Sequence, residues 1–284
     1  MRFPKEASNI VSMLSRSLHR CVFVLLVSCV GYGVAQDQVL SLGGYYQGLN
    51  LFISNPIKAD GYGYCVQKVL VNGNVLPASI QSDYVEINLA LFDLKKGDEI
   101  FVELDHGAEC SPRFVNPEVL LPLSTFVINS LSATPTGKVT WVASNESGKL
   151  NFMVEQFKWG RWVAAGEVQG KGTRSANTYT LSIIPTSGKN KIRISQIDNT
   201  GQTRSSQPVT FQASQPAVIK TPAKVKSMLY FKTNGKAAKT KFELYDAYGN
   251  LLIKGYDSQI NCSSLLNGIY YINFDNKSEK IIKY

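Results

Sequence analysis

The residues able to support catalysis or metal binding gather in one short segment, Leu104-Asp-His-Gly-Ala-Glu-Cys-Ser111. Asp105, His106 and Glu109 bring together carboxylate and imidazole groups, which are ligand types that bind divalent metals. The spacing is not specific, because an exposed polar turn beside a disulfide accounts for the same residues. No P-loop, dinucleotide-binding fingerprint or zinc motif occurs in the sequence. We therefore expect no metal site and no cofactor.

Enzymatic mechanisms find little support in the other residues. Beyond residue 35 the only histidine is His106, so a mechanism with two histidines is excluded and a serine or cysteine triad would have to use this one. Asp198-Asn-Thr-Gly201 lacks the downstream glutamate of a calcium loop and is typical of a turn. Two distant carboxylates could form a glycosidase pair, but small domains without long loops provide a poor cleft for one. The sequence favours a non-enzymatic protein.

Aromatic side chains offer a different chemistry, which is binding. Tyr45 and Tyr46 lie in the first part of the chain, and Trp159 and Trp162 lie further on. Exposed rings of this kind stack on sugars or anchor protein interfaces. The alternative is that they are core and turn residues, with Trp159-Gly160 as a hairpin turn that leaves one ring exposed. Both interpretations stay open at this level.

The N-terminus has the order of basic, apolar and small residues that marks a secretory signal peptide. Arg16 and Arg20 precede the apolar run Cys21–Val27, which is too short to span a bilayer. Gly33-Val34-Ala35 follows as a cleavage site, so we expect residues 1–35 to be the signal peptide.

A second interpretation treats Leu26-Val27-Ser28-Cys29 as a lipoprotein box, in which a lipid on Cys29 tethers the protein to a membrane. The leader is also long enough for translation to begin at Met13. No later segment is long and apolar enough to cross a membrane. We expect an exported protein at the cell surface, outside the cell or in the periplasm.

Three cysteines remain after the leader. Cys65 and Cys110 fall in the same expected domain, and in an oxidising compartment we expect them to form a disulfide. Closing a loop of about 45 residues stabilises a domain by roughly 3–4 kcal/mol in the chain-entropy model. Cys262 is then left as a buried thiol in a strand-like run.

The positive charge is concentrated at the C-terminus. Residues 36–215 carry 15 basic and 15 acidic side chains, whereas residues 216–284 carry 11 basic and 5 acidic ones. This excess is either a solvated lysine-rich surface or a docking surface for an anionic partner such as lipopolysaccharide, an anionic glycan or an acidic protein face. Because the charge is mostly scattered lysine on an exported protein, we expect no nucleic-acid partner.

Alternation of apolar and polar residues recurs beyond residue 35, and sustained helical periodicity does not. In the range 36–125, alternation runs through Val85–Leu91 and resumes at Ile100–Leu104, and Asn72-Gly73 is typical of a hairpin turn. This range is expected to be an N-terminal β-sandwich domain.

The range 126–213 has short strand candidates separated by turn residues, which is typical of a Greek-key sandwich. The candidates are 139–142, 152–157, 162–168, 179–184, 191–197 and 209–211. Over nearly the whole range the sequence resembles fibronectin type III-like modules, on the runs Val139–Val142, Phe152–Phe157 and Lys191–Gly201. The resemblance implies a fold and no particular function.

A linker is expected at 214–226, where two prolines and several small or polar residues precede the next apolar strand, and a small β domain is expected at 227–284. Within that domain, Leu251–Lys254 is a strand candidate that Gly255 is expected to stop. Gly268 is expected to supply a backbone conformation that residues with a Cβ disfavour.

The end of the chain carries the spaced positions Leu265, Gly268 and Tyr270, followed by Lys277, Lys280 and Lys283. On these positions it resembles the C-terminal sorting domain of proteins handled by the bacterial type IX secretion system. The resemblance implies an address or docking module. Sorting domains usually open with a proline-asparagine-proline type motif, and Thr221-Pro-Ala-Lys stands in its place here, so processed cargo and a retained component both fit. The domain order is also similar to that of PorA-like proteins, which are implicated in signalling for that system.

The sequence thus predicts an all-β protein of three small Ig-like or fibronectin-like β-sandwich domains in tandem after a signal peptide. The predicted function is that of a non-enzymatic exported interaction protein, whose C-terminal domain docks to the type IX secretion machinery or to other envelope proteins. The alternative is a carbohydrate-binding or adhesin-type cell-surface protein, which predicts a line of exposed aromatic residues on one sandwich face.

Overall fold

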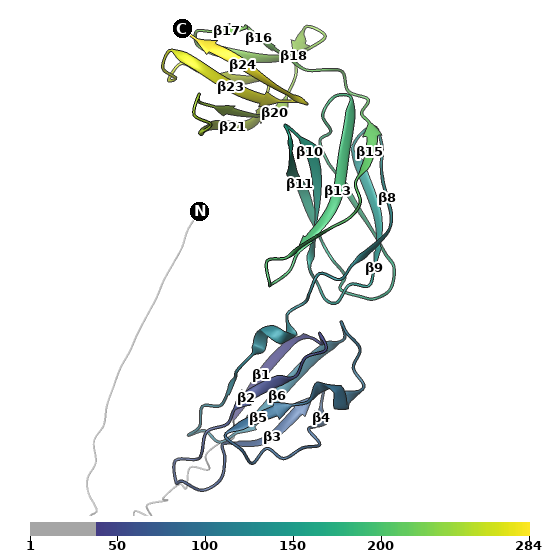
Figure 1. Ribbon diagram of the computed structural model, residues 1–284, viewed down its shortest axis with the longest axis vertical. Coiled ribbons are helices and arrows are strands. Elements are labelled where there is room, and N and C mark those ends of the chain that lie inside the picture. The colour runs from purple at the N-terminus through teal and green to yellow at the C-terminus, as the bar shows by residue number, and fades with distance from the viewer. Residues whose placement is uncertain (1–37) are drawn as a thin grey trace, which may run out of the picture. The chain divides into compact units, whose positions relative to one another are not determined.

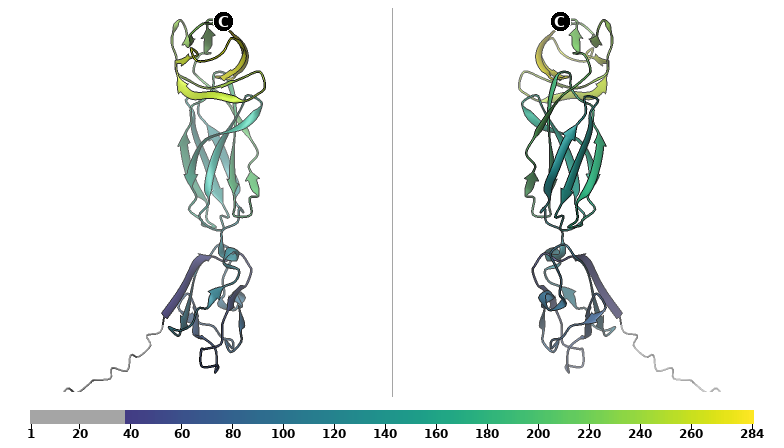
Figure 2. Two further views of the ribbon diagram at one scale, coloured as in Figure 1. Left: turned by 90° about the vertical axis from the view of Figure 1, so that its left-hand side faces the viewer. Right: turned by 90° about the vertical axis from the view of Figure 1, so that its right-hand side faces the viewer.

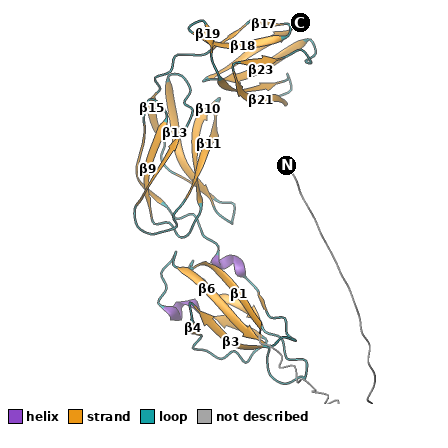
Figure 3. Cartoon of the chain, turned by 180° about the vertical axis from the view of Figure 1, so that it is seen from behind, coloured by secondary structure: helices purple, strands orange, loops and turns teal. Residues whose placement is uncertain are grey.

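Residues 38–284 are described by a computed structural model, and their regular structure is almost entirely β (Figure 1). The only helices in this part of the chain are two short 3-10 helices, shown against the strands in Figure 3. Across these residues no helix is long and apolar enough to cross a membrane. The all-β prediction is confirmed. The predicted signal peptide at 1–35 and Cys29 lie outside the described residues.

The N-terminal domain consists of two sheets around one core. The sheets have the strand orders β1-β6-β3-β4 and β5-β2-β7. The strands are β1 Gln38–Tyr45, β2 Leu51–Ser54, β3 Val66–Val71, β4 Asn74–Val75, β5 Tyr84–Ile87, β6 Glu99–His106 and β7 Arg113–Phe114. Alternation turns Val102 and Leu104 of β6 and Leu51 and Ile53 of β2 into the same core, and all four side chains are fully buried.

Two local expectations in this domain have different outcomes. Asn72 and Gly73 both have positive φ (49° and 78°) and join β3 to β4, which confirms the hairpin turn. The strand expected through Val85–Leu91 instead ends at Ile87. Asn88 accepts a hydrogen bond from the backbone N–H of Ala90 and caps the 3-10 helix η1, Leu89–Phe92. A capping side chain there offers the backbone an alternative to the strand ladder.

The middle domain also has two sheets, seen in Figure 2 from two sides. One has the order β11-β10-β13-β14, with β15 also paired to β13, and the other has the order β12-β9-β8. The strands are β8 Val127–Ala133, β9 Lys138–Ser144, β10 Asn151–Lys158, β11 Arg161–Gln169, β12 Asn177–Ser182, β13 Lys189–Ile197, β14 Thr203–Ser205 and β15 Val209–Gln212. Trp141 and Phe152 meet edge to face in its core, with ring centroids 5.9 Å apart. All six predicted strands are present.

The C-terminal domain pairs a sheet of order β17-β24-β23-β20-β21 with a sheet of order β16-β18-β19, in which β22 also pairs with β18. The strands are β16 Ile219–Thr221, β17 Lys224–Val225, β18 Met228–Thr233, β19 Lys236–Ala237, β20 Thr240–Tyr245, β21 Leu251–Asp257, β22 Gln259–Asn261, β23 Gly268–Phe274 and β24 Lys277–Lys283. The fully buried Phe231 and Phe274 join the two sheets, with ring centroids 5.3 Å apart.

The structure differs from two expectations at this end of the chain. The range expected to be a linker, 214–226, contributes strands β16 and β17 as well as Val218 and Val225 of the core. Strand β21 does not stop at Gly255 but continues to Asp257. A Cβ on Gly255 would lie 2.9 Å from Cζ of Phe242, so glycine there gives room to a core ring on the neighbouring strand.

The predicted disulfide between Cys65 and Cys110 is present. It joins the residue before β3 to the segment after β6. Strands β3 and β6 are also paired with each other in one sheet. The backbone N–H of Gly107 donates to the carbonyl of Cys65 beside it. Cys262 is fully buried, as expected, and burial raises the pKa of its thiol.

Replacing Cys65 and Cys110 together with alanine is expected to lower the free energy of unfolding of the N-terminal domain by roughly 3–4 kcal/mol, because the unfolded chain regains the entropy of an open loop. Hydrogen exchange followed by mass spectrometry measures the loss in peptides of β3 and β6. Peptides of β10 and β13 serve as an internal control and are expected to exchange as before. Unchanged exchange in β3 and β6 would contradict a stabilising role for the disulfide.

Candidate functional site

The predicted sorting residues hold the C-terminal domain together. Leu265 packs against the core, and the buried Tyr270 donates a hydrogen bond from its hydroxyl to the carbonyl of Leu266 (2.9 Å). That bond closes the turn that leads into β23. The tyrosine of the motif is therefore buried within the fold, and the leucine is partly buried against the same core.

Gly268 departs from its expected role. It begins β23, where it is paired with Lys283, and it is not among the residues with positive φ. A Cβ at this position would lie 3.9 Å from Cε2 of Tyr270, which is an ordinary contact. The expectation of a conformation that only glycine adopts easily is wrong, because the strand has already started at this residue.

The three C-terminal lysines have different surroundings. Nζ of Lys277 donates to the carbonyl of Val218 (3.2 Å), and Nζ of the largely buried Lys283 donates to the carbonyl of Tyr284 (3.1 Å). Lys280 is exposed. Of these three lysines, Lys280 is therefore the one placed to meet a partner.

One side of the sheet β17-β24-β23-β20-β21 faces away from the core, and we call it the outer face. The strand register arranges its side chains in rows that cross the strands. A polar row comprises Ser278, Asn273, Glu243 and Lys254. Beside it lies a row of Lys280, Tyr271, Tyr245 and Leu251, followed by Lys224, Ile282 and Ile269.

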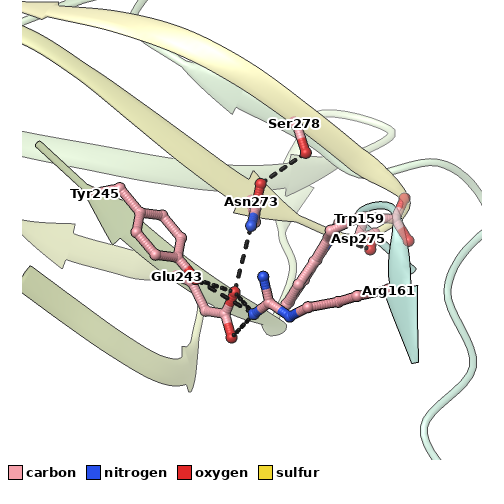
Figure 4. Close-up of polar contacts among 7 residues, drawn as sticks. All are labelled: Trp159, Arg161, Glu243, Tyr245, Asn273, Asp275 and Ser278. Carbon is pink, nitrogen blue, oxygen red and sulfur yellow. Dashed lines mark hydrogen bonds and ion pairs between the residues drawn. The ribbon is translucent and has the colours of Figure 1, made fainter. Parts of the chain in front are cut away.

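Ser278, Asn273 and Glu243 of the polar row form a connected network, which Tyr245 of the neighbouring row and Arg161 of the middle domain complete (Figure 4). Ser278 donates to Oδ1 of Asn273 (2.6 Å), and Nδ2 of Asn273 donates to Oε2 of Glu243 (3.3 Å). Nη2 of Arg161, just after the β10–β11 turn, donates to both carboxylate oxygens of Glu243 (2.8 and 2.6 Å). The hydroxyl of Tyr245 donates to the same carboxylate (2.8 Å).

The electrostatics of this network favour its charged form. Burial opposes ionisation of Glu243, but hydrogen bonds from Tyr245 and Asn273 together with Arg161 outweigh it and lower the pKa of the carboxyl. The same contacts, first with Tyr245 and then with Glu243, raise the pKa of the Arg161 guanidinium. Because the guanidinium is half exposed, the pair orients the two domains more than it stabilises the fold.

Apart from Tyr245, the residues in the other rows of the outer face are open to solvent. Leu251, Ile269, Tyr271 and Ile282 are each between 40% and 48% exposed, which is high for large apolar side chains gathered on one sheet. The exposed Lys224 and Lys280 stand at the edge of this apolar area. Such a surface has the chemistry to bind an apolar patch with acidic neighbours.

Residues 221–284 match the family model described as "Secretion system C-terminal sorting domain". The C-terminal domain is a sorting domain by this match. The resemblance inferred from the chain end is thereby confirmed for this domain, and the match begins at Thr221, the last residue of β16, rather than at residue 227. The more specific similarity to PorA-like proteins has no support from the match. None of the curated proteins matches the chain in sequence.

Solved structures with partial similarity include fibronectin(III)-like modules of Clostridium thermocellum CbhA (14% identity over 56% of this chain and 93% of that one, TM-score 0.21). Latent PorU of Porphyromonas gingivalis matches at 12% identity over 87% of this chain and 31% of that one, with a TM-score of 0.22. The chicken CNTN1 FN1–FN3 domains match at 9% identity, 87% and 95% coverage and a TM-score of 0.23. At these scores the similarities carry no argument about function.

A second set of contacts joins the sorting domain to the middle domain, and we call it the joint. At its centre is Asp275, a buried residue in the β23–β24 turn. The backbone N–H of Ser187 donates to Oδ1 of Asp275 (2.6 Å), and the Ser187 hydroxyl and the backbone N–H of Val218 (3.2 Å) donate to Oδ2. Nε1 of Trp159 donates to the carbonyl of Asp275 (3.0 Å). The carboxylate thus binds the loop between β12 and β13 and the segment that connects the domains.

The tip of the β10–β11 hairpin brings a lysine into the same region. Nζ of Lys158 lies 4.4 Å from the ring centroid of Trp159, and the side chain is almost fully buried. Burial, and then the nearby charge of Lys241, lower the pKa of Lys158 to about 8. The joint therefore contains an ammonium group that is easier to deprotonate than an ordinary lysine.

The residues that suggested metal or catalytic chemistry are not brought together in this way. His106 is buried, and its Nδ1 lies 2.9 Å from the carbonyl oxygen of Gly107, so that nitrogen donates. Asp105 is partly buried on β6, and Glu109 is exposed in the loop that follows. No group of three or more His, Cys, Asp or Glu residues that could hold a metal occurs within residues 38–284.

The four candidate binding aromatics lie in different settings. Tyr46 belongs to the core of the N-terminal domain, and Tyr45 packs directly on Gly148, where a Cβ would lie 2.7 Å from its ring. Trp159 belongs to the joint. Trp162 is partly buried and meets Phe157 edge to face, with ring centroids 5.3 Å apart. The four do not form one line on a sandwich face.

Sequence reasoning missed the residues that make the joint. Asp275 and Ser187 lie in short turns that resemble any exposed turn, and nothing in the sequence pairs two residues that are 88 positions apart. The Trp159-Gly160 turn was a usable signal: its positive φ angles (54° and 77°) confirm the hairpin. The partner of its ring, which is the turn at Asp275, could not be inferred.

The low pKa of Lys158 predicts a pH-dependent stability. Below about pH 8 the amine is protonated in both the folded and the unfolded chain, and folding must desolvate the charge. Between about 8 and 10.5 the unfolded chain binds more protons, so the stability of the native chain is expected to rise with pH in this window. Lys158→Met is expected to be more stable than the native chain at pH 7, with the difference shrinking towards pH 10.

Urea unfolding of both chains from pH 7 to pH 10 measures this difference. The matched control is Lys138→Met, which replaces an exposed lysine of the same domain and is expected to shift stability by a constant amount. A difference between native chain and Lys158→Met that does not change with pH would show that Lys158 stays protonated throughout.

Proposed function

We propose that this chain is a non-enzymatic exported interaction protein of the type IX secretion system, whose sorting domain docks through the open rows of its outer face. The observation that carries the proposal is the family match of residues 221–284. A sorting domain of this kind implies a secreted or cell-surface protein and an interaction with secretion machinery. The two preceding sandwich domains are then the part that the machinery exports or presents.

The outer face supplies the physical argument for the docking side. The core of a protein interface is apolar and its rim is polar. Tyr271, Ile269 and Ile282 form an apolar centre, and Lys224 and Lys280 form part of a cationic rim. The lysines steer an acidic partner, and burial of the apolar rows then supplies most of the affinity.

Double substitution of Tyr271 and Ile282 with serine tests this role. Both side chains are 40–48% exposed, so the domain is expected to keep its fold, since surface substitutions usually change stability by less than about 0.5 kcal/mol. Loss of two anchors at the centre of an interface is expected to reduce surface-located protein at least about tenfold. Cell fractionation with quantitative mass spectrometry gives the amount in each compartment.

The matched control is Tyr248→Ser together with Leu266→Ser, which removes two apolar side chains that are 92% and 82% exposed and lie in turns. Docking by the outer face would be contradicted if the control and test variants reduced export equally, or if neither variant reduced it. Mass spectrometry of the two chain ends in the same fractions separates the finer proposals. An intact Tyr284 in the periplasm supports a retained component, its loss at the cell surface supports processed cargo, and a lipid on Cys29 supports a tethered protein.

A second candidate function, carbohydrate binding, is favoured by one cluster in the middle domain. Phe157 is 41% exposed, and Nζ of Lys191 lies 5.7 Å from the ring centroids of both Phe157 and Trp162. The Arg193 guanidinium lies 4.4 Å from the Trp162 ring. Aromatic rings beside cations have the chemistry to bind an anionic glycan, as an adhesin or carbohydrate-binding protein would.

A glycan array probed with the purified exported chain tests this second candidate. Binding to sulfated or uronic-acid glycans that Trp162→Ala reduces at least about tenfold would support it. The control, Tyr256→Ala, removes an aromatic residue of similar size from the sorting domain. A blank array, or binding that the two variants reduce equally, would leave the secretion-linked function as the better account.

A further inference from the structure

The segment that connects the middle domain to the sorting domain is hydrogen-bonded along nearly its whole length. The backbone N–H groups of Ala213 and Ser214 donate to the carbonyls of Gly188 and Pro135 (2.9 and 3.1 Å). The side chain of Gln215 donates to the carbonyl of Pro185. The first half of the segment is therefore bound to the middle domain.

The second half of the same segment is bound to the sorting domain. The carbonyl of Ala217 accepts from the Thr233 hydroxyl (3.0 Å), and the carbonyl of Val218 accepts from Nζ of Lys277 (3.2 Å). The backbone N–H of Val218 donates to Asp275, and the Val218 side chain is buried in the core. Within residues 213–218, every residue except Pro216 makes a hydrogen bond to one of the two domains.

Asp275 is the residue at which the two halves meet. Its carboxylate accepts from Ser187, on the middle-domain side, and from Val218, at the start of the sorting domain. Asn276 strengthens the contact, because its Nδ2 donates to the carbonyl of Ser187 (2.9 Å). A buried carboxylate is costly to leave without its hydrogen-bond donors, and these three donors hold the segment to both domains.

We propose that the sorting domain is a docked domain, and that the joint centred on Asp275 shields residues 213–218 from endoproteases. An endoprotease needs an extended stretch of several residues on either side of the bond it cuts, so a segment held by hydrogen bonds must first open locally. The rate of cutting then follows the population of the open state. The proposal concerns the joint alone and holds whether or not the outer face docks to secretion machinery.

Limited proteolysis of the purified exported chain with subtilisin, under native conditions and with mass spectrometry of the fragments, tests the proposal. The native chain is expected to be cut within 213–218 only after exposed turns such as 246–250 have been cut. Asp275→Asn removes the negative charge and one acceptor but keeps the positive φ of that turn (47°), which asparagine tolerates. It is expected to raise the rate of cutting within 213–218 at least about tenfold, which corresponds to about 1.4 kcal/mol of opening free energy.

Two further variants make the test specific to the joint. Ser187→Ala removes one donor on the middle-domain side without touching the sorting domain, and it is expected to raise the same rate severalfold. Asp246→Asn makes the same charge change in the β20–β21 turn, where Asp246 accepts from the backbone N–H groups of Tyr248 and Asn250 (both 2.9 Å). This control is expected to leave cutting within 213–218 unchanged to within about twofold.

The possible outcomes decide the proposal. It is overturned if the native chain is cut within 213–218 as early as at 246–250, or if Asp275→Asn and Ser187→Ala are cut there at the native rate. Hydrogen exchange of β23 and β24 is measured in parallel. If Asp275→Asn loses protection in those strands, its cutting reports unfolding of the sorting domain, and the result for Ser187→Ala, whose residue lies in the middle domain, decides.

Discussion

The contact between the sorting domain and the middle domain depends on one buried carboxylate. Asp275 is 5% exposed, and its oxygens accept three hydrogen bonds, two from Ser187 and one from Val218. A carboxylate buried in this way is stable only when its acceptors are filled, and each donor would itself be unpaired without it. The turn, the loop and the connecting segment therefore take up their positions together.

This constraint also determines how the outer face is divided. Once the β23–β24 turn is fixed by Asp275, the β10–β11 hairpin lies over the polar row, and Arg161 completes the network around Glu243. The apolar rows of Tyr271 and Ile269 receive no such cover. The same face thus makes an intramolecular contact through its polar part and leaves its apolar part exposed. A partner bound on the apolar rows would lie next to the middle domain, where it would contact both the sorting domain and the middle domain.

Much of the fold could be predicted because alternation and turn chemistry are local properties. Asn72-Gly73 and Trp159-Gly160 indicate hairpins by residue type alone, and the six strand candidates of the middle domain are all present. Strand β8 was not among the strand candidates because its alternation is weak, since it is largely exposed along Val127–Ala133. The strand expected through Val85–Leu91 failed because Asn88 caps a 3-10 helix, a choice that depends on side-chain geometry.

The candidate site was predictable only in part, for a physical reason. The sorting motif was visible as residue types in fixed order, although Leu265 and Tyr270 proved to stabilise a turn. The disulfide followed from the placement of Cys65 and Cys110 in one domain. The joint pairs Ser187 with Asp275, and Arg161 with Glu243, across 88 and 82 positions. Such pairs depend on how the folded domains contact each other, and no local sequence pattern predicts that.

The position of the last strand has a mechanical meaning. Strand β24 is not at the edge of its sheet but lies between β17, to which it runs parallel, and β23. A force that pulls the end of β24 away from the middle domain acts along these strands, so it strains their hydrogen bonds side by side and at once, not one after another as in a zipper. A strand held on both sides in this way resists extraction from its sheet.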